Sequence, residues 1–352
     1  MVEPERPNVL GWLRGSGRGP SLMLNGHLDT AVETTGWTKP VYGGDVEGDR
    51  LYGHGISNMK ASNAAMMCAA AALRRADVRL EGDLLVALVV GECAGGVGTR
   101  DLMAKGVRTD AFLCGEPTDL GVLTVHACSQ YLRIEITGRT GHFAAPDEGV
   151  NAIAKACALL ERLGPMYRPI APGAWMRGAS KPLYAGLPRY QVSAIRGGLT
   201  RNLIESFALT PDFCEVVLNV RATPNKHMNE TREDIEQVLA VMQREDAGWL
   251  YTVRTIRQMP GFEAPPGSRA TEAAIAAYRA VIDDPPRVGG LQPFMFMSSD
   301  AGHMQVAGIT DGVLIGPGRF TASTPDEHVE IEKMVAAARI YAATALTLCG
   351  GA

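Results

Sequence analysis

Two uninterrupted apolar runs limit the folds that are open to this chain. One lies within a predicted strand from Ser21 to Asn25, and the other lies within a predicted strand from Asp83 to Val90. Strands that are apolar at every position are buried on both faces, which is typical of the parallel strands of α/β proteins. Between the two runs, an Ala- and Met-rich segment from Ala61 to Leu73 predicts a helix. The pattern therefore predicts an α/β layer fold with a mixed, mostly parallel sheet.

Polar side chains follow three of the predicted strands. His27 follows the first run, Glu92 follows the second, and Glu116 follows a third apolar strand at Ala111 to Cys114. In such sheets, ligands bind beyond the carboxyl ends of the strands. We therefore expect these three side chains to meet in one crevice, which makes the crevice the candidate functional site.

The bulk composition excludes several classes of protein. The 352 residues suffice for two domains, and a net charge of −4 gives no basic surface for nucleic acid. No apolar run approaches the roughly 20 residues that span a bilayer, and the first residues do not resemble a signal peptide. The seven cysteines are scattered without CxxC pairs, which favours reduced thiols and a cytoplasmic location.

A second pattern begins near Tyr131. The segment from Tyr131 to Thr137 alternates as a half-exposed strand does, and the elements that follow complete the order β-α-β-β-α-β of a ferredoxin-like unit. The first pattern then resumes with a helix from Ser268 to Val281. We therefore predict a discontinuous catalytic-type domain at residues 1–129 and 261–352, with an inserted domain at residues 130–260.

Two helix starts are predicted from capping signals. Ser57 or Asn58 stands where it could cap the helix that begins at Ala61. Near the C-terminus, Thr324 to Glu327 has the form of a capping box with Pro at the first helical position, which predicts that the last helix begins there.

Five short segments give the chain a family resemblance. They are Gly26-His27-Leu28-Asp29-Thr30, Leu51-Tyr52-Gly53-His54-Gly55-Ile56-Ser57-Asn58-Met59-Lys60, Gly91-Glu92-Cys93-Ala94-Gly95-Gly96, Gly115-Glu116-Pro117-Thr118 and Ser323-Thr324-Pro325-Asp326-Glu327. In this order they resemble the M20 metallopeptidase family, on the side of acetylornithine deacetylase and succinyl-diaminopimelate desuccinylase. The resemblance covers nearly the whole chain. It implies a zinc-exopeptidase-like catalytic domain and an inserted lid that also forms a homodimer.

One segment of that family has no counterpart here. Its members usually carry a further helix and strand before the stretch that resembles Asn8 to Gly11. The resemblance therefore leaves open whether the N-terminus is trimmed or misassigned.

Three positions depart from the metal ligands that the resemblance implies. Family members hold two zinc ions with a bridging Asp, a His and an acidic residue on one ion, and a Glu and a C-terminal His on the other. This chain keeps His27 and Glu116 but has Asn58 at the bridge, Cys93 at the Glu position and Ser323 at the His position. We therefore expect no metal, or at most a single zinc ion on His27 and Glu116.

Other functional positions match the family. Glu92 matches the general base, and Asp29 matches the carboxylate that orients the metal-binding histidine. The remaining matches are a lid histidine that stabilises the oxyanion, His142, and residues that bind substrate or line its pocket, Arg221, Asn202, His126 and Asp300.

Three functions are consistent with this pattern. The first is an enzyme with a rebuilt site, which acts by Glu92 acid–base chemistry on a small amide or amino-acid-like molecule bearing a carboxylate. The second is a conventional zinc-dependent deacylase in which Cys93 and a histidine such as His303 or His328 replace the missing ligands. The third is a non-catalytic binding protein. The expected partners are the small substrate and a second copy of the chain, with neither nucleic acid nor membrane.

Overall fold

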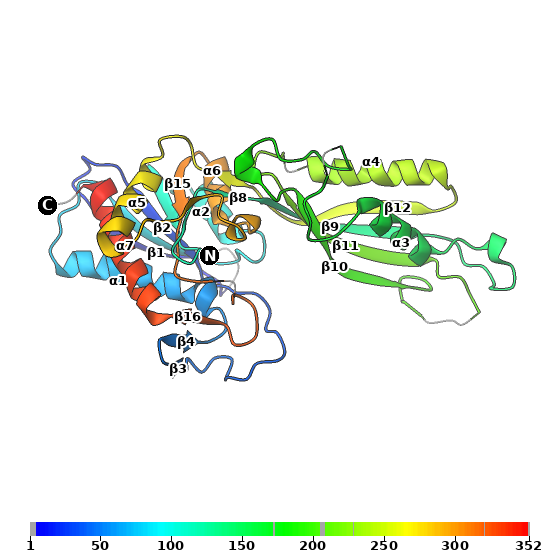
Figure 1. Cartoon of the computed structure of the whole chain (residues 1–352), viewed down its shortest axis with the longest axis horizontal. Helices are drawn as coiled ribbons and strands as arrows, with labels where there is room; N and C mark the ends of the chain where they lie inside the picture. The colour runs from blue at the N-terminus through cyan, green and yellow to red at the C-terminus, as the bar shows by residue number, and fades with distance from the viewer. Residues whose placement is uncertain (1–4, 172, 205–207, 228, 320, 351–352) are drawn as a thin grey trace. The chain divides into compact units, whose positions relative to one another are not determined.

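The computed structural model describes residues 5–171, 173–204, 208–227, 229–319 and 321–350 (Figure 1). The chain forms two compact units. Unit 1 comprises Met1–His126 and Phe262–Ala352, and unit 2 comprises Ala127–Gly261. The predicted boundaries at residues 129/130 and 260/261 lie within a few residues of this division.

Unit 1 is built on a sheet of seven strands. In spatial order they are β1 (Val9–Leu13), β5 (Leu84–Val89), β2 (Leu22–His27), β6 (Ala111–Cys114), β15 (Asp311–Leu314), β7 (Val122–Leu123) and β14 (Val288–Gly289). The central strands β5, β2, β6 and β15 are parallel, whereas β1 pairs antiparallel with β5 and β15 pairs antiparallel with β7. These pairings confirm the prediction of a mixed, mostly parallel sheet, and every residue of β2 and β5 is buried, as expected.

Three helices pack together on one face of this sheet. They are α1 (Ala61–Arg75), α5 (Arg269–Val281) and α7 (Ile331–Cys349), which lie side by side in Figure 1. Small residues on these helices, such as Ala273 and Ala337, share one core with Leu22 and Leu24 of β2. The shorter helices α2 (Val97–Ala104) and α6 (Asp300–Val306) contact each other, and α6 packs on β6 and β15. Within the described ranges, every helix is too short or too polar to span a bilayer.

The last helix begins later than the capping box predicts. Helix α7 starts at Ile331, because His328–Glu330 forms strand β16 instead of a first helical turn. Strand β16 pairs antiparallel with β4 (Arg50–Tyr52), which in turn pairs with β3 (Val46–Glu47). This small sheet brings the residue before β16 next to the loop that follows β4. The capping-box prediction was therefore wrong, and the discrepancy bears directly on the site.

Unit 2 has the predicted order of elements. They are β9 (Cys128–Thr137), α3 (Ala152–Leu163), β10 (Arg189–Gly198), β11 (Phe213–Ala222), α4 (Glu230–Glu245) and β12 (Leu250–Met259). All pairings in the sheet β10-β11-β9-β12 are antiparallel, which is the ferredoxin-like topology. Its core contains Leu132 and Ile134 of β9 together with Ile235 and Leu239 of α4. The predicted fold class is confirmed in both units.

Minor elements complete the described chain. A two-stranded sheet joins β8 (Val125–His126) to β13 (Phe262–Glu263), a π-helical turn covers Ile56–Lys60, and short 3-10 turns cover Pro146–Glu148, Pro182–Tyr184 and Phe294–Phe296. All seven cysteines are free thiols.

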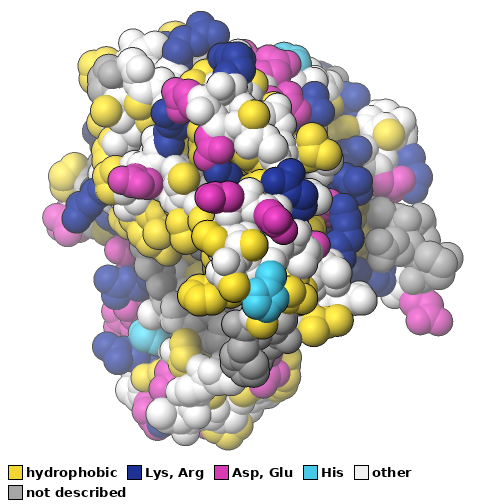
Figure 2. Space-filling model, turned by 90° about the vertical axis from the view of Figure 1, so that its right-hand side faces the viewer, with side chains coloured by type: hydrophobic (Ala, Val, Ile, Leu, Met, Phe, Trp, Pro, Cys, Tyr) yellow, Lys and Arg dark blue, Asp and Glu magenta, His cyan; other side chains and the backbone are white. Residues whose placement is uncertain are grey.

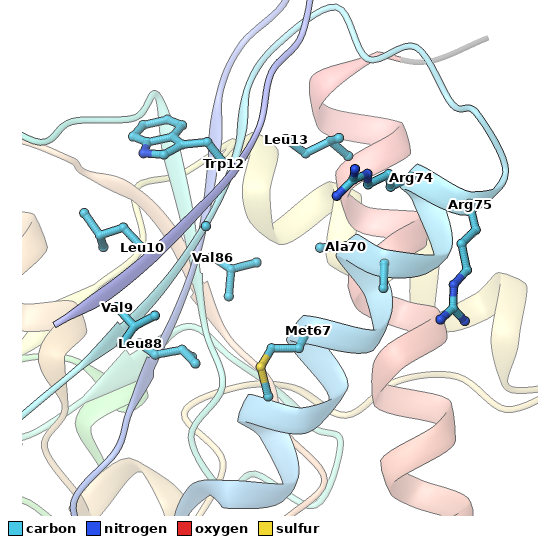
Figure 3. Close-up of a pocket in the computed structure, with 12 residues that line it drawn as sticks. Val9, Leu10, Trp12, Leu13, Met67, Ala70, Arg74, Arg75, Val86 and Leu88 are labelled. Carbon is cyan, nitrogen blue, oxygen red and sulfur yellow. The ribbon is translucent and has the colours of Figure 1, made fainter.

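Apolar side chains are also exposed at the surface. Figure 2 shows hydrophobic side chains interspersed with Lys, Arg, Asp and Glu on the face that it presents. Beside the edge strand β1, a hollow of about 660 Å³ lies between Leu10, Trp12 and Leu13 on one side and Met67 and Ala70 of α1 on the other (Figure 3). Because Met67 is 51% exposed, this hollow is open to solvent.

Candidate active site

The ring of His27 lies at the carboxyl end of β2 and is almost fully buried. Nδ1 lies 2.7 Å from the backbone oxygen of Asp29, and Nε2 lies 2.9 Å from Oδ1 of Asn58. An oxygen acceptor faces each ring nitrogen, an arrangement that suits a ring protonated at both nitrogens. Burial alone would lower the pKa of His27, but the carboxyl groups of Glu116, Glu92, Asp29 and Asp300 outweigh it and raise the pKa to about 9.

The loop that carries Asn58 is fixed by Glu327. Its Oε1 accepts hydrogen bonds from the backbone N–H groups of Ser57 (2.8 Å) and Asn58 (3.1 Å). Its Oε2 accepts from the N–H groups of Gly55 (2.9 Å) and Ser323 (3.2 Å). Asn58 therefore does not cap α1 as predicted. The N-cap position is Lys60, which makes no capping hydrogen bond, and the Asn58 amide faces His27.

Asp29 holds the ends of β2 and β5 together. Its two carboxylate oxygens accept from the backbone N–H groups of Glu92 (3.1 Å) and Cys93 (2.9 Å). The carboxylate lies 3.9 Å from Nδ1 of His27, farther than the backbone oxygen of the same residue. Asp29 therefore contacts His27 through its main chain, while its side chain sets the position of Glu92.

Glu116 and Asp300 are buried carboxyl groups near the imidazolium. Oε1 of Glu116 lies 3.9 Å from Nε2 of His27 and has no hydrogen-bond partner. Burial raises the pKa of Glu116, with His27 opposing the shift and Glu92 adding to it. Burial also raises the pKa of Asp300, and Glu92 raises it further. Four carboxyl groups thus surround one buried positive charge.

Cys93 and Ser323, the other two positions that depart from the implied metal ligands, lie in turns. Cys93 follows Glu92 in the turn after β5 and is partly buried. Ser323 has a positive φ of 62° and is tied through its N–H group to Glu327. Asn58 and Ser323, which stand at the bridge and at the C-terminal His position, are therefore held by the same carboxyl group.

The two alternative histidines each have a ring nitrogen bound to a backbone oxygen. Nε2 of His303 lies 3.1 Å from the carbonyl oxygen of Gly95, and Nδ1 of His328 lies 3.0 Å from that of Asp326. Burial and the Arg100 guanidinium lower the pKa of His303 to about 4, so its ring is neutral. His126 is fully buried, and its Nε2 lies 2.9 Å from Oγ of Ser299, next to Asp300.

The predicted lid residues all lie in unit 2. His142 is exposed, and its Nδ1 accepts from the N–H of Ala144 at 3.1 Å. Asn202 lies in an exposed turn. Arg221 lies in β11 with its guanidinium stacked 5.9 Å from the centre of the Tyr131 ring. Their roles in substrate binding stay predictions.

The side chains present do not fit a two-zinc centre. The bridge position offers only a neutral amide, and its oxygen already lies against Nε2 of His27. Zinc in proteins takes three or four Cys, His or carboxylate ligands. His27 and Glu116 supply two such ligands for a single ion, and Nε2 could bind it only after releasing Asn58.

Gly316 sets how closely the strand ends approach. A Cβ on Gly316 would collide with the backbone oxygens of Glu116 and Gly115. We expect Gly316→Ala to destabilise the protein by about 2 kcal/mol. Gly11→Ala is the matched control, because a Cβ there meets nothing within 4 Å, and it should stay within about 0.5 kcal/mol of wild type. Urea unfolding measures both, and equal stability of the two variants would contradict this close approach.

Several solved structures share this architecture. The chain aligns with a di-peptidase from Saccharomyces cerevisiae with a TM-score of 0.77 at 14% identity, covering 97% of this chain and 82% of that one. It aligns with an M20 family metallo-carboxypeptidase from Sulfolobus solfataricus with a TM-score of 0.76 at 16% identity, covering 97% and 87%. The chain therefore shares the fold of these two proteins.

Sequence comparison assigns the family. The chain belongs to peptidase family M20/M25/M40, whose family model matches residues 23–347. It is 27% identical to acetylornithine deacetylase from Myxococcus xanthus, over 99% of this chain and 85% of that protein. It is 26% identical to N-formyl-4-amino-5-aminomethyl-2-methylpyrimidine deformylase from Bacillus subtilis (strain 168), over 99% and 84%. The protein is therefore an enzyme of amidohydrolase type.

Proposed function

We propose that this enzyme works with a rebuilt site, metal-free or with at most one metal ion, on a small amide that bears a carboxylate. The observation that carries the proposal is the 2.9 Å contact between Nε2 of His27 and Oδ1 of Asn58. At the position where the family resemblance implies a carboxylate bridge between two metal ions, the chain has a neutral amide. That amide accepts a hydrogen bond from the protein's own imidazolium.

The roles that we propose for His27 and Glu92 follow from the charges of their side chains. The His27 imidazolium supplies a fixed positive charge in a buried site, where electrostatic stabilisation is strong. Glu92 lies at the end of β5 with its backbone held by Asp29, and it would take and return the proton. Such a pair can serve the hydrolysis of an amide, or the formation of an amide by condensation or cyclisation.

The relatives narrow the substrate class that we propose. By their names, one removes an acetyl group from acetylornithine and the other removes a formyl group from an aminopyrimidine. We therefore propose a small N-acylated amino acid, or a similar amide that bears a carboxylate, as substrate. Oxyanion stabilisation by His142, carboxylate binding by Arg221 and Asn202, dimerisation through unit 2 and a cytoplasmic location belong to the same proposal.

The metal content of the enzyme tests the proposal. Protein purified without chelator should contain less than about one zinc ion per chain, and its turnover of an N-acyl amino acid should survive dialysis against a chelator. One tightly bound zinc ion would select the mononuclear form, for which the unpartnered Oε1 of Glu116 is the available second ligand. Two zinc ions per chain, with activity lost to the chelator and restored by zinc, would establish a conventional deacylase instead.

A further inference from the structure

The hydrogen bonds of Glu327 require a side chain that only accepts hydrogen bonds, which among the amino acids is a carboxylate. It is fully buried, and its two oxygens receive four backbone N–H groups from two loops. An ionised carboxylate only accepts hydrogen bonds, whereas the isosteric amide of Gln turns one end into a donor. An amide here would set its NH₂ group against two of the four N–H donors.

The loop that Glu327 contacts has irregular backbone next to the start of α1. Asn58 and Met59 have non-helical backbone angles inside the turn that leads into α1, with φ of −129° and −143°. Hydrogen bonds from an outside acceptor therefore replace those that a regular helix would supply. Glu327 reaches the loop because β16 pairs with β4, and the backbone of Gly53 also donates to the carbonyl oxygen of Glu327 at 3.0 Å.

We propose that Glu327 is a positioning residue for the site. Its carboxylate fixes the backbone of Gly55–Asn58 so that Oδ1 of Asn58 meets Nε2 of His27, and it anchors Ser323 to the same point. The two positions that depart most from a metal site thus share one rigid support. The proposal concerns the geometry of the loop and is independent of the reaction that we propose.

Glu327→Gln tests this role, with Glu330→Gln as the matched control. Glu330 lies three residues on, at the end of β16, and pairs with the partly exposed Arg319. Two readouts are followed in the full chain: amide hydrogen exchange, and the ring N–H signal of His27 in ¹H–¹⁵N NMR. The His27 signal is assigned by its absence in His27→Gln.

We expect amide exchange in residues 53–60 to rise at least about tenfold in Glu327→Gln, with the His27 signal lost or shifted. Exchange in β2 and β6 should not change, and Glu330→Gln should match wild type. An unchanged loop and ring signal in Glu327→Gln would overturn the proposal, as would uniform acceleration across unit 1 or an equal effect of Glu330→Gln.

Glu327→Asp keeps the carboxylate on a shorter side chain and decides the case if Glu327→Gln does not fold. A folded Glu327→Asp protein with a partial rise in loop exchange and a shifted His27 signal supports the role. A folded Glu327→Asp protein with a wild-type loop and ring overturns it, and failure of both variants to fold assigns Glu327 to folding and also overturns it.

Discussion

Replacing Glu92 by Gln is expected to lower turnover by about 10²- to 10⁴-fold, the usual contribution of a general acid–base group. Glu92 is 6% exposed and follows β5 at the edge of the sheet where His27 and Glu116 also lie. Gln keeps the shape but cannot carry a proton between substrate and product. The effect should therefore fall on kcat more than on KM. Steady-state kinetics on the best substrate from a panel of N-acyl amino acids measures it.

The control for this experiment is Glu81→Gln, whose side chain is about half exposed and pairs only loosely with Arg18. Its turnover should equal that of wild type. Because Asp29 holds Glu92 through its backbone, the substitution leaves those hydrogen bonds in place, and unfolding midpoints should agree. A Glu92→Gln enzyme that keeps more than a tenth of wild-type turnover would remove Glu92 from proton transfer.

Restoring the three misfit positions is expected to create metal binding. The triple variant Asn58→Asp, Cys93→Glu and Ser323→His gives the chain every ligand that the family resemblance implies. It should retain about two zinc ions per chain after dialysis, because each ion then has two protein ligands of its own and shares the bridging carboxylate as a third. Free zinc at about 1,000 times the dissociation constant would stabilise the variant by roughly 4 kcal/mol.

A second triple variant tests whether zinc binding depends on where the three substitutions are made, and not only on the residue types that are introduced. Asn229→Asp, Cys68→Glu and Ser16→His make the same exchanges at exposed positions. This control should bind no more zinc than wild type in elemental analysis and show no zinc-dependent rise in melting temperature. If the first triple variant also binds no more zinc than wild type, the three residues are not what separates this chain from a two-zinc enzyme.

The central strands of the sheet could be predicted because burial on both faces leaves a plain mark in the sequence. Strand β6 has the predicted bounds, and β2 and β5 differ from prediction by one or two residues at each end. The placement of His27, Glu92 and Glu116 at one edge follows from the same parallel arrangement. These features depend on periodicity and order, which the sequence shows directly.

The contacts that hold the site in place could not be predicted. The sequence around Glu327 and Asn58 indicates local capping roles, whereas their actual partners lie far away in the chain. Thr324 to Glu327 has the form of a capping box, yet Glu327 binds the N–H of Asn58 from 269 residues away. Asn is a residue type that often caps helices, yet the amide of Asn58 faces His27. In both cases the side chain contacts a distant residue and does not cap a helix. The pairing of β16 with β4, which brings Glu327 to the loop of Asn58, is seen only in the structure.

The discontinuity of unit 1 has a consequence for biosynthesis. Strand β15, which lies between β6 and β7, is encoded after the whole of unit 2. As the chain leaves the ribosome, unit 2 can fold while β6 still lacks its neighbour β15. At that stage the apolar residues of β2 and β5 are not yet covered by α5 and α7. The anchor of the His27–Asn58 pair emerges later still, with Glu327. Nascent chains halted before β15 should therefore resist protease in unit 2 and remain cleavable in the N-terminal segment.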